Sequence, residues 1–481
     1  MAPLRLWAAW RRPLAAAVLA AACSGQPATE ARRVEAPSPS PDHAALVESV
    51  DALAGDALQR GPIAGLSIAV VADGRTVLAK GYGHADREAA VAATADTSYP
   101  IASVTKQFTA AAVLRLAEQG RLSLEDPLRR FFPAARPKIG VLTLRHLLSH
   151  TSGLTRGGPA PRAAALSVLT RGGTARAQGA HWDYSNYNFS LLGLVIEQAS
   201  GRSYADYVRD ELAVPLGLTG TGYCEDGTAL PGRARDYLSG LKTVTPTDYW
   251  TQARFFASGG LCSTVLDLVR WTKALEEGRV VRPASLQAMR SPTPLPEGVE
   301  ADYGYGTRLG MTGGHRKLGH TGGGQGNKAV LARYPDDDLT VVVLLNTERP
   351  NAAATANDLE ERIAEVFFGL EETSPTDIAM RQEGQPLYPD GGRQRLSRYA
   401  GRYRDRGRLV RVTVGEGTLE LRTDPRRNAR SALAAVGGDV FRDVEDPSVQ
   451  LRFQVRGDEA KGYGRDHNGW FVGLGVRDAA P

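Results

Sequence analysis

The stretch "YPIASVTKQFTAAAVLRLAEQG", residues 99–120, places Ser103 three residues before Lys106. Residues three apart share one face of a helix, so the Lys106 amine can reach the Ser103 hydroxyl if a helix starts here. Burial lowers the pKa of a lysine, and a helix N-terminus favours developing negative charge. The spacing therefore predicts a serine nucleophile with a lysine as its base.

The simpler alternative is that Ser103 only caps the helix. Lys106 occupies the position where a capping box would carry Glu or Gln, which weakens this alternative. A second Ser-x-x-Lys pair, Ser239 and Lys242 in "LSGLKTVTP", contains a glycine and is followed by threonines and a proline. No helix is expected there, so this second pair shows what a chance occurrence looks like.

A second candidate stretch, "HWDYSNYNFS", carries Tyr184, Ser185 and Asn186 just before another helical pattern. A tyrosine can exchange protons with a serine hydroxyl when neighbouring cations lower its pKa. An asparagine two residues later can hydrogen-bond both a substrate amide and the lysine. Taken alone, however, these residues favour an ordinary surface turn that leads into a capped helix.

A third stretch, "LGHTGGGQGN", places His320, Thr321, Gly322 and Gly323 immediately before a β-rich pattern. Glycines allow close approach of the backbone to a ligand. A polar pair followed by glycines on an edge strand suits substrate docking, and a flexible loop is the alternative.

The elements that must position these residues follow from the periodicity. Residues 65–83 predict a hairpin that turns at Asp73-Gly74, and residues 327–348 predict a second hairpin. Helices are expected from Ser103 to Gln119, which ends at Gly120, from about 185 to Gly201, and over 356–370.

The order of these elements is hairpin, many helices, hairpin and helix. Strands from both ends should therefore form one antiparallel sheet with the helical middle packed on it, an α+β fold over residues 45–370. A linker over 371–392 follows. From about residue 393 short β-like runs such as "LVRVTV" and "VQLRFQV" predict a separate small all-β domain over 393–481, a barrel or a sandwich.

Residues 1–23 are typical of an export signal, with arginines, a short apolar run and then small residues. Cys23, followed by Ser24 and Gly25, matches the cleavage box of a bacterial lipoprotein imperfectly. We therefore expect a periplasmic protein, anchored in the membrane through a lipidated Cys23 or released by ordinary cleavage. Residues 24–44 are rich in Pro, Ser and charge and predict a flexible linker.

Export places the mature chain in an oxidising compartment. If Cys23 carries lipid, Cys224 and Cys262 remain, and two thiols in such a compartment favour a disulfide. Two separately buried thiols are the alternative.

The length of 481 residues is enough for a large catalytic domain and a smaller one. A net charge of +5 spread over this length, without a clustered basic face, gives no indication of nucleic-acid binding. His146 and His150 have a spacing that metal ligands use, but no third ligand accompanies them, so no metal is expected.

Taken together, Ser103-Val-Thr-Lys106, Tyr184-Ser-Asn186 and His320-Thr-Gly322 resemble the three motifs of the serine β-lactamase and penicillin-binding-protein superfamily. The chain is most similar to its class C β-lactamase and D-alanyl-D-alanine carboxypeptidase branch. "LTLRHLLSHTSGL" (142–154), "LAVPLGLTGTGY" (212–223) and "ASGGLCSTVLDLVRW" (257–271) also look like that branch. The C-terminal part is similar, more weakly, to lipocalin-like modules attached to some of these hydrolases.

The resemblance implies a β-lactamase-like fold and an acyl-enzyme on Ser103, with Lys106 and Tyr184 sharing the base and acid roles. Which of the two takes the first proton stays open. It further implies that Asn186 orients the lysine and the substrate. The backbone N–H groups of Ser103 and Gly323 would form the oxyanion hole, and His320 and Thr321 would hold the far end of the substrate. No cofactor is implied.

One departure bears on the substrate. Classical β-lactamases of this type carry lysine where this chain has His320, and a histidine is only partly charged near neutral pH. The chain in this respect resembles D-alanyl-D-alanine carboxypeptidases, D-aminopeptidases and some esterases. We therefore expect a monomeric serine hydrolase of D-amino-acid peptides or β-lactams. The alternatives are an esterase for small esters and a non-catalytic penicillin-binding envelope protein.

Overall fold

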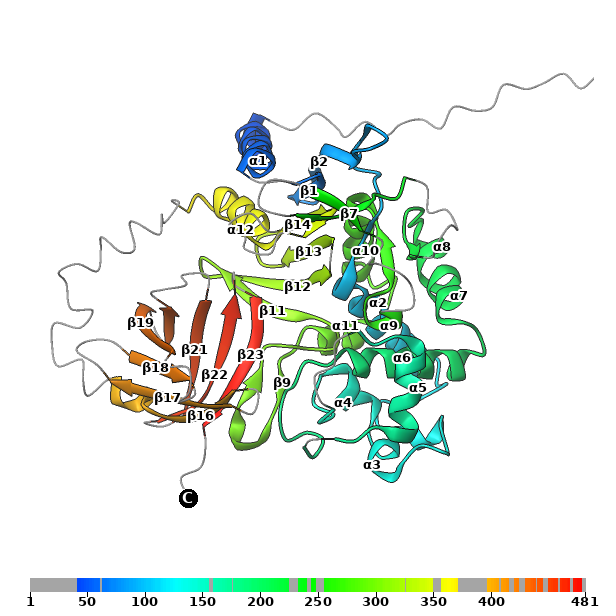
Figure 1. The fold of residues 1–481 in the computed structure, drawn as a ribbon, viewed down its shortest axis with the longest axis vertical. Coiled ribbons are helices and arrows are strands. Elements are labelled where there is room, and N and C mark those ends of the chain that lie inside the picture. Colours follow the sequence, from blue (N-terminus) through cyan, green and yellow to red (C-terminus); the bar gives the residue numbers. More distant parts are fainter. Residues whose placement is uncertain are drawn as a thin grey trace, which may run out of the picture. The chain divides into compact units, whose positions relative to one another are not determined.

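The structure of the protein is a computed structural model, drawn in Figure 1. It describes residues 41–477 apart from gaps at 61–62, 155–158, 175, 225–231, 240–243, 248–254, 325, 349–355, 371–395, 406–407, 415–418, 424–428, 438, 444–448, 457–458 and 468–469. The predicted export signal, Cys23, the linker over 371–392 and Lys242 lie outside the described residues. The predicted linker over 24–44 extends too far, because helix α1 (Pro41–Arg60) already begins at Pro41.

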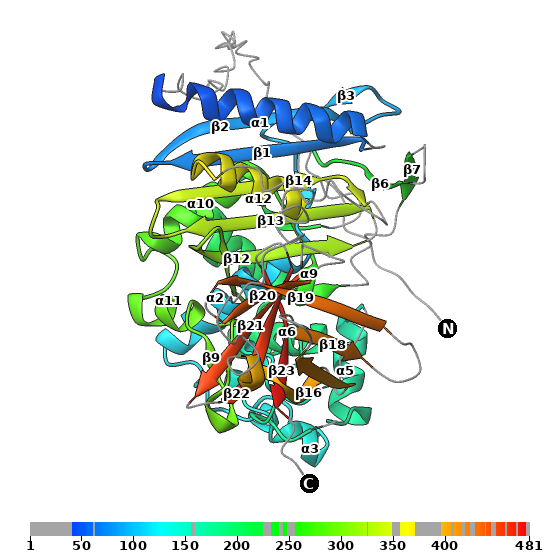
Figure 2. The same ribbon diagram turned by 90° about the vertical axis from the view of Figure 1, so that its left-hand side faces the viewer.

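The central sheet joins strands from both ends of the first 370 residues, as the sequence predicts. Its strand order is β11-β12-β13-β14-β1-β2-β3, and β1 pairs antiparallel with both β2 and β14. Figure 2 shows β2, β1, β14, β13 and β12 side by side. The bounds of the strands in the sheet are β1 Gly65–Ala72, β2 Arg75–Asp86, β3 Val91–Ala92, β11 Arg308–Thr312, β12 His315–Gly324, β13 Asn327–Tyr334 and β14 Leu339–Leu345.

Both predicted hairpins are confirmed, and so is the predicted turn at Asp73-Gly74. Asp73 and Gly74 connect β1 to β2, with φ of 51° and 70°. Two successive residues with positive φ are typical of a type I′ turn, whose twist matches that of the strands.

The sheet is covered by helices on both faces, because its strands are apolar on both sides. Ile68 and Val70 of β1 pack with α1 and with α12 (Ala356–Phe367) in one hydrophobic cluster. Ala69, between them, faces the other cluster, which contains the helical region. This alternation follows from the two-residue period of a strand.

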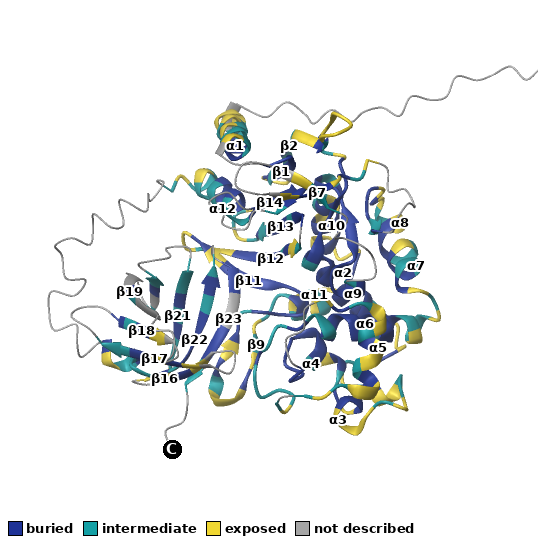
Figure 3. Cartoon of the chain, in the orientation of Figure 1, coloured by how far each residue is buried: buried dark blue, intermediate teal, exposed yellow. Residues whose placement is uncertain are grey.

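The helical region surrounds helix α2 (Thr105–Glu118), most of which is buried, as Figure 3 shows. Phe108 of α2 stacks on Trp271 of α10 (Val265–Glu276) with ring centroids 3.9 Å apart. The remaining helices are α3 Pro137–Gly140, α4 Leu144–Leu148, α5 Arg162–Arg171, α6 Asn186–Ser200, α7 Tyr204–Val208, α8 Val214–Leu216, α9 Phe256–Gly259 and α11 Pro283–Met289. None of the described helices combines the length and the apolar character that crossing a membrane requires.

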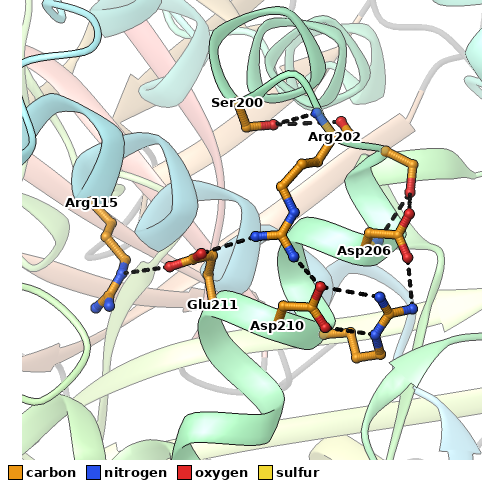
Figure 4. Close-up of polar contacts among 8 residues, drawn as sticks. Arg115, Ser200, Arg202, Asp206, Asp210 and Glu211 are labelled. Carbon is orange, nitrogen blue, oxygen red and sulfur yellow. Dashed lines mark hydrogen bonds and ion pairs between the residues drawn. The ribbon is translucent and has the colours of Figure 1, made fainter.

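An ion-pair network at the surface connects α2 to the segment between α7 and α8 (Figure 4). Glu211 forms an ion pair with Arg115 at 3.8 Å and accepts a hydrogen bond from Arg202 at 3.0 Å, and Arg202 also pairs with Asp210. These side chains are about one-third exposed, so each pair contributes at most about 1 kcal/mol. The network orients the segment more than it stabilises the fold.

The C-terminal part is all β, as predicted. Strand β16 pairs with β17 and also with β23, which closes strands β16 to β23 into an antiparallel barrel. The strands are β16 Gly401–Asp405, β17 Arg408–Val414, β18 Leu419–Thr423, β19 Ala429–Gly437, β20 Val440–Asp443, β21 Val449–Arg456, β22 Glu459–His467 and β23 Trp470–Arg477. The likeness to lipocalins stays a prediction.

Aromatic side chains fill the interior of the barrel. Their ring centroids lie 4.9–5.9 Å apart, the spacing at which aromatic pairs attract. They are Tyr399, Tyr403, Phe441, Phe453 and Tyr463.

The barrel is joined to the central sheet rather than standing apart from it. Gly310 of β11 pairs with Trp470 of β23, and the indole of Trp470 is buried in the cluster under α1 and α12. Its Nε1–H donates to Glu360 at 3.1 Å, and Glu360 also pairs with the buried Lys317 at 3.1 Å. The separate domain that the sequence predicts therefore shares a core with the sheet, a contact that short strand patterns do not reveal.

Candidate active site

Ser103 lies in a single 3₁₀ turn (Ala102–Val104) that leads directly into α2. The residue before it, Ala102, has φ of 47°, a left-handed conformation that non-glycine residues adopt only under constraint. No side chain caps either the turn or α2. The capping alternative for Ser103 is therefore wrong.

A small three-stranded sheet supports this turn, and the Ile101 N–H at the start of the turn donates to the carbonyl oxygen of Leu261 in that sheet. Its strands are β4 (Tyr99–Pro100), β8 (Leu261–Ser263) and β5 (Gly222–Tyr223), in the order β4-β8-β5. A disulfide joins Cys224 to Cys262, and both cysteines pack against Ala102. The covalent link thus supports the strained residue beside the nucleophile.

Lys106 is completely buried, and its amine has three partners. The Nζ atom lies 3.0 Å from Ser103 Oγ, 2.9 Å from Asn186 Oδ1 and 2.7 Å from the carbonyl oxygen of Ser258. The amide and carbonyl oxygens can only accept, so they use two N–H groups. A neutral Lys106 then directs its lone pair at the Ser103 hydroxyl, which is the geometry of a general base.

The surroundings of Lys106 favour this neutral form. Burial is the largest cause that lowers the pKa of Lys106, and the charge of Arg308 lowers it further. Interaction with Tyr184 acts in the opposite direction but does not outweigh burial.

Tyr184 lies beside Lys106. Its ring lies 4.8 Å from the Lys106 Nζ atom. Burial raises the pKa of Tyr184, but the charges of Lys106 and Arg308 and hydrogen bonds with Lys106 and Ser103 lower it more, so the pKa of Tyr184 falls below its ordinary value. The predicted motif therefore comes together around Ser103, and the alternative of a plain surface turn is wrong.

His150 holds the turn that carries Tyr184. Its Nδ1 atom accepts from the Ser185 N–H at 3.2 Å and lies 3.0 Å from Asn188 Nδ2. Because Nδ1 accepts, the neutral ring carries its hydrogen on Nε2. Burial lowers the pKa of His150 well below its usual range.

The spacing of His146 and His150 does not form a metal site. The Nδ1 atom of His146 lies 2.7 Å from the Thr143 hydroxyl, and within the described residues no cluster of His, Cys, Asp or Glu is arranged to hold a metal.

The opposite wall of the site is strand β12, which carries His320, Thr321, Gly322 and Gly323. A Cβ atom on Gly322 would lie 2.2 Å from the carbonyl oxygen of Ile101, so only glycine lets β12 approach the nucleophile turn this closely. The predicted site residues of all three motifs are thus brought to one place.

His320 is a neutral side chain in this environment. Its Nδ1 lies 2.6 Å from the carbonyl oxygen of Thr321, an obligate acceptor, so Nδ1 carries the hydrogen. Nε2, at 3.1 Å from the Tyr303 hydroxyl, then accepts. Burial, followed by the charges of Arg308 and Lys106, lowers the pKa of His320 well below its usual range.

Sequence reasoning missed two residues of this wall, Tyr303 and Arg308. Arg308 opens strand β11 and lies with its guanidinium carbon 5.1 Å from the centre of the Tyr184 ring. The only signal in the sequence is a single charge in the run "YGYGTRLGM", and no motif marks it.

Comparisons with known proteins indicate the family and the fold of the chain. The sequence profile of the family described as Beta-lactamase matches residues 50–365. The chain is 28% identical over 290 residues to the putative penicillin-binding protein PbpX of Bacillus subtilis, which covers 59% of this chain and 70% of that protein. It is 30% identical over 301 residues to a D-aminopeptidase of Brucella anthropi, covering 58% of this chain and 56% of the relative. The chain thus spans little more than half the length of that relative.

The fold matches a solved structure as well. The octameric penicillin-binding protein homologue from Pyrococcus abyssi superposes with a TM-score of 0.62 at 23% identity, over 89% of this chain and 99% of that one. This likeness concerns the fold alone, and it extends beyond the residues that the family profile matches.

Proposed function

We propose that this chain, which belongs to the beta-lactamase family and is a hydrolase, cleaves amide bonds next to D-amino acids through an acyl-enzyme on Ser103. The observation that carries the proposal is the contact of Ser103 Oγ with Lys106 Nζ at 3.0 Å, in a turn where Ser103 has no capping role. The substrate is a small molecule or a peptide.

In the acylation step, Ser103 Oγ attacks the substrate carbonyl carbon, and its proton passes to the group that Lys106 and Tyr184 form. The same proton then moves to the leaving nitrogen as the C–N bond breaks. Proton transfer by positioned groups of this kind is worth about 10²–10⁴ in rate. Water activated by the same group hydrolyses the acyl ester and regenerates Ser103.

Negative charge develops on the carbonyl oxygen during both steps. The backbone N–H groups of Ser103 and Gly323 are suited to stabilise it, since β12 approaches the nucleophile turn closely at Gly322. Each such donor is worth about 10²–10³ in rate. Asn186 orients Lys106, and Thr321 lies on the strand that would bind the extended substrate.

The substrate class rests on the D-aminopeptidase relative and on His320. Because His320 is neutral, it provides no fixed charge where classical β-lactamases carry a lysine, so efficient β-lactam hydrolysis is not expected. Penicillins should nevertheless acylate Ser103, because acylation needs only the nucleophile, its base and the oxyanion hole.

A labelling experiment tests the nucleophile. The full chain is incubated with a fluorescent penicillin and, separately, with a fluorophosphonate. Label should appear on the wild type and on Ser239→Ala, the matched variant of the second Ser-x-x-Lys pair. Ser103→Ala should remain unlabelled, and labelling of this variant would overturn the proposal.

A substrate panel tests the substrate class. p-Nitroanilides of D-alanine and L-alanine, D-Ala-D-Ala peptides, nitrocefin and p-nitrophenyl acetate are compared at matched concentrations. The D-configured amides or peptides should have the highest kcat/KM. Preference for the acetate ester would favour the esterase alternative, and absence of any turnover by a labelled enzyme would favour the non-catalytic one.

We also propose that the mature chain is a monomer that acts outside the cytoplasm, either soluble in the periplasm or anchored through lipid on Cys23. The support is the signal-like segment over residues 1–23. Fractionation of cells that express the full chain and its Cys23→Ala variant tests the anchor. An anchored chain should lose its membrane association in the variant alone, and a wild type that is already soluble would exclude the anchor. Light scattering of the purified protein tests the monomer.

A further inference from the structure

Arg308 is a buried cation without a counter-ion in the part of the chain that the structure describes. Only 9% of the residue is exposed, and no described carboxylate lies within ion-pair distance of its guanidinium. The nearby carboxylates of Asp302 and Asp466 bind Arg452 instead, at 3.4 and 3.0 Å. A buried charge usually has a paired partner, so an unpaired one points to a role in the site.

The position of Arg308 is set by the barrel. Its guanidinium donates to the carbonyl oxygen of Phe471 in strand β23, and its Nε atom has no partner among the described residues. The Phe471 ring packs on Trp182, with centroids 4.8 Å apart, and Trp182 lies two residues before Tyr184. The barrel thus contacts both Arg308 and the segment that carries Tyr184.

We propose that Arg308 supplies the permanent positive charge of the active site, which His320 does not carry, and that the barrel holds this charge beside Tyr184 through the Phe471 carbonyl. Arg308 is a positioning residue, because it acts on Lys106 and Tyr184 rather than on the substrate. The inference rests on the proposed function. It explains how the site keeps a fixed cation: classical β-lactamases carry a lysine at the position of His320 on β12, whereas this chain carries Arg308 on the neighbouring strand β11.

The other groups that face Tyr184 do not provide this charge. They come from the 3₁₀ turn before α2, α2 itself, the loop after α4, the segment before β11, and β12. They are Ser103, Lys106, His150, Tyr303 and His320. His150 and His320 are held neutral by burial, and burial raises the pKa of Tyr303 well above its usual value. Lys106 must itself lose its proton to act as a base, whereas arginine stays charged.

The charge of Arg308 lowers the pKa of Lys106 and of Tyr184 in the same direction. Removing it should therefore raise the pKa of the base, whichever of the two groups takes the first proton. The acid limb of the pH profile should move to higher pH by about one unit, the size expected for a neighbouring charge. Below the wild-type limb this shift corresponds to a rate about ten-fold lower.

The experiment measures the rate constant for acylation of the full chain by p-nitrophenyl acetate, an uncharged ester, as a function of pH. Arg308→Gln should shift the acid limb upward. Arg308→Lys should shift it less, because a lysine keeps a charge when its pKa permits. Arg333→Gln is the matched control, since Arg333 lies in β13 with a side chain 14% exposed and pairs with Asp338 and Glu276 outside the site. It should leave the limb in place.

Phe471→Ala keeps the carbonyl that binds Arg308 but removes the ring that packs on Trp182, so it tests whether the packing of the barrel holds this carbonyl in place. It should shift the limb in the same direction, by less than Arg308→Gln. Circular dichroism and thermal melting establish that each variant is folded. An acid limb that is unchanged in folded Arg308→Gln would overturn the inference. An unchanged limb in folded Phe471→Ala would overturn the part in which the ring packing of the barrel keeps Arg308 in place. Ester turnover that persists in Ser103→Ala would instead overturn the proposed function, so the two failures are distinguishable.

Discussion

The two walls of the site are built in different ways. The wall formed by α2 and the start of α6 carries Ser103, Lys106, Tyr184 and Asn186, and their contacts connect short sequence motifs. The wall formed by β11 and β12 depends on residues that are far apart, because the position of Arg308 is set by Phe471 of the barrel, 163 residues later.

This difference suggests that one wall carries the reacting groups and the other sets the charge around them. In the proposed mechanism the helical wall contains the groups that make and break bonds, and the disulfide that packs against Ala102 supports this wall locally. The strand wall contributes a neutral histidine and a buried arginine, and it depends on the barrel. Variants on the helical wall should therefore lose catalytic rate, whereas variants on the strand wall should change the pH profile or the stability.

The largest effect is expected for Lys106→Ala on the helical wall. Its amine bonds three partners in a completely buried position, and loss of the base should lower kcat/KM by about 10⁴-fold, the upper end for such groups. Rates of labelling by a fluorophosphonate measure this loss. Lys273→Ala, a change of an exposed lysine on α10, is the control and should react like the wild type.

The next effect concerns stability and the strand wall. Trp470→Ala removes a buried indole from the core under α1 and α12 and leaves Glu360 without one of its donors. Replacement of a buried tryptophan by alanine costs about 3–5 kcal/mol. Urea unfolding should show this loss in the whole chain, and a loss confined to the barrel, with the catalytic part unfolding as before, would contradict a shared core.

Tyr184→Phe should have an intermediate effect, a loss of about 10²-fold in kcat/KM. The packing of the ring is retained, so folding should be unaffected. The pH profile identifies the role of Tyr184, since the acid limb disappears if the phenolate is the base and the basic limb disappears if the phenol is the acid. An unchanged rate would exclude Tyr184 from proton transfer.

The smallest effect is expected for His320→Gln. The pKa of His320 lies well below its usual range, so its ring is already neutral at and above pH 6.5 and produces no limb there. Glutamine can replace both hydrogen bonds, and the rate should fall by less than about ten-fold. Loss of the acid limb in this variant would show that His320 titrates during catalysis.

The helical wall was predictable from sequence because its residues are local. Ser103 and Lys106 share a helix face, so their spacing alone predicts a pair. Tyr184 and Asn186 are joined to this pair only by the resemblance of the three motifs to the superfamily. The hairpin at Asp73-Gly74 and the helix end at Gly201 were predictable for the same reason, since both need left-handed backbone.

The strand wall was only half predictable. The His320 motif lies in one short stretch, but the role of Arg308 depends on the pairing of β11 with β12 and on the carbonyl of Phe471. Backbone carbonyls have no sequence signature, and neither does the burial that holds His320 neutral. The contact of Trp470 with Glu360 was missed because each residue alone is typical of an ordinary core or helix.

The place of Trp470 has a consequence for how such proteins can be recombined. Its indole closes a core whose other members come from residues up to 364, so the barrel does not behave as an exchangeable cassette. A graft that replaced it would have to bring a matching aromatic residue for Glu360 and Lys317, and a carbonyl at the position of Phe471. A chimaera that keeps the hydrolase part alone would therefore retain Arg308 but lose the carbonyl that binds it.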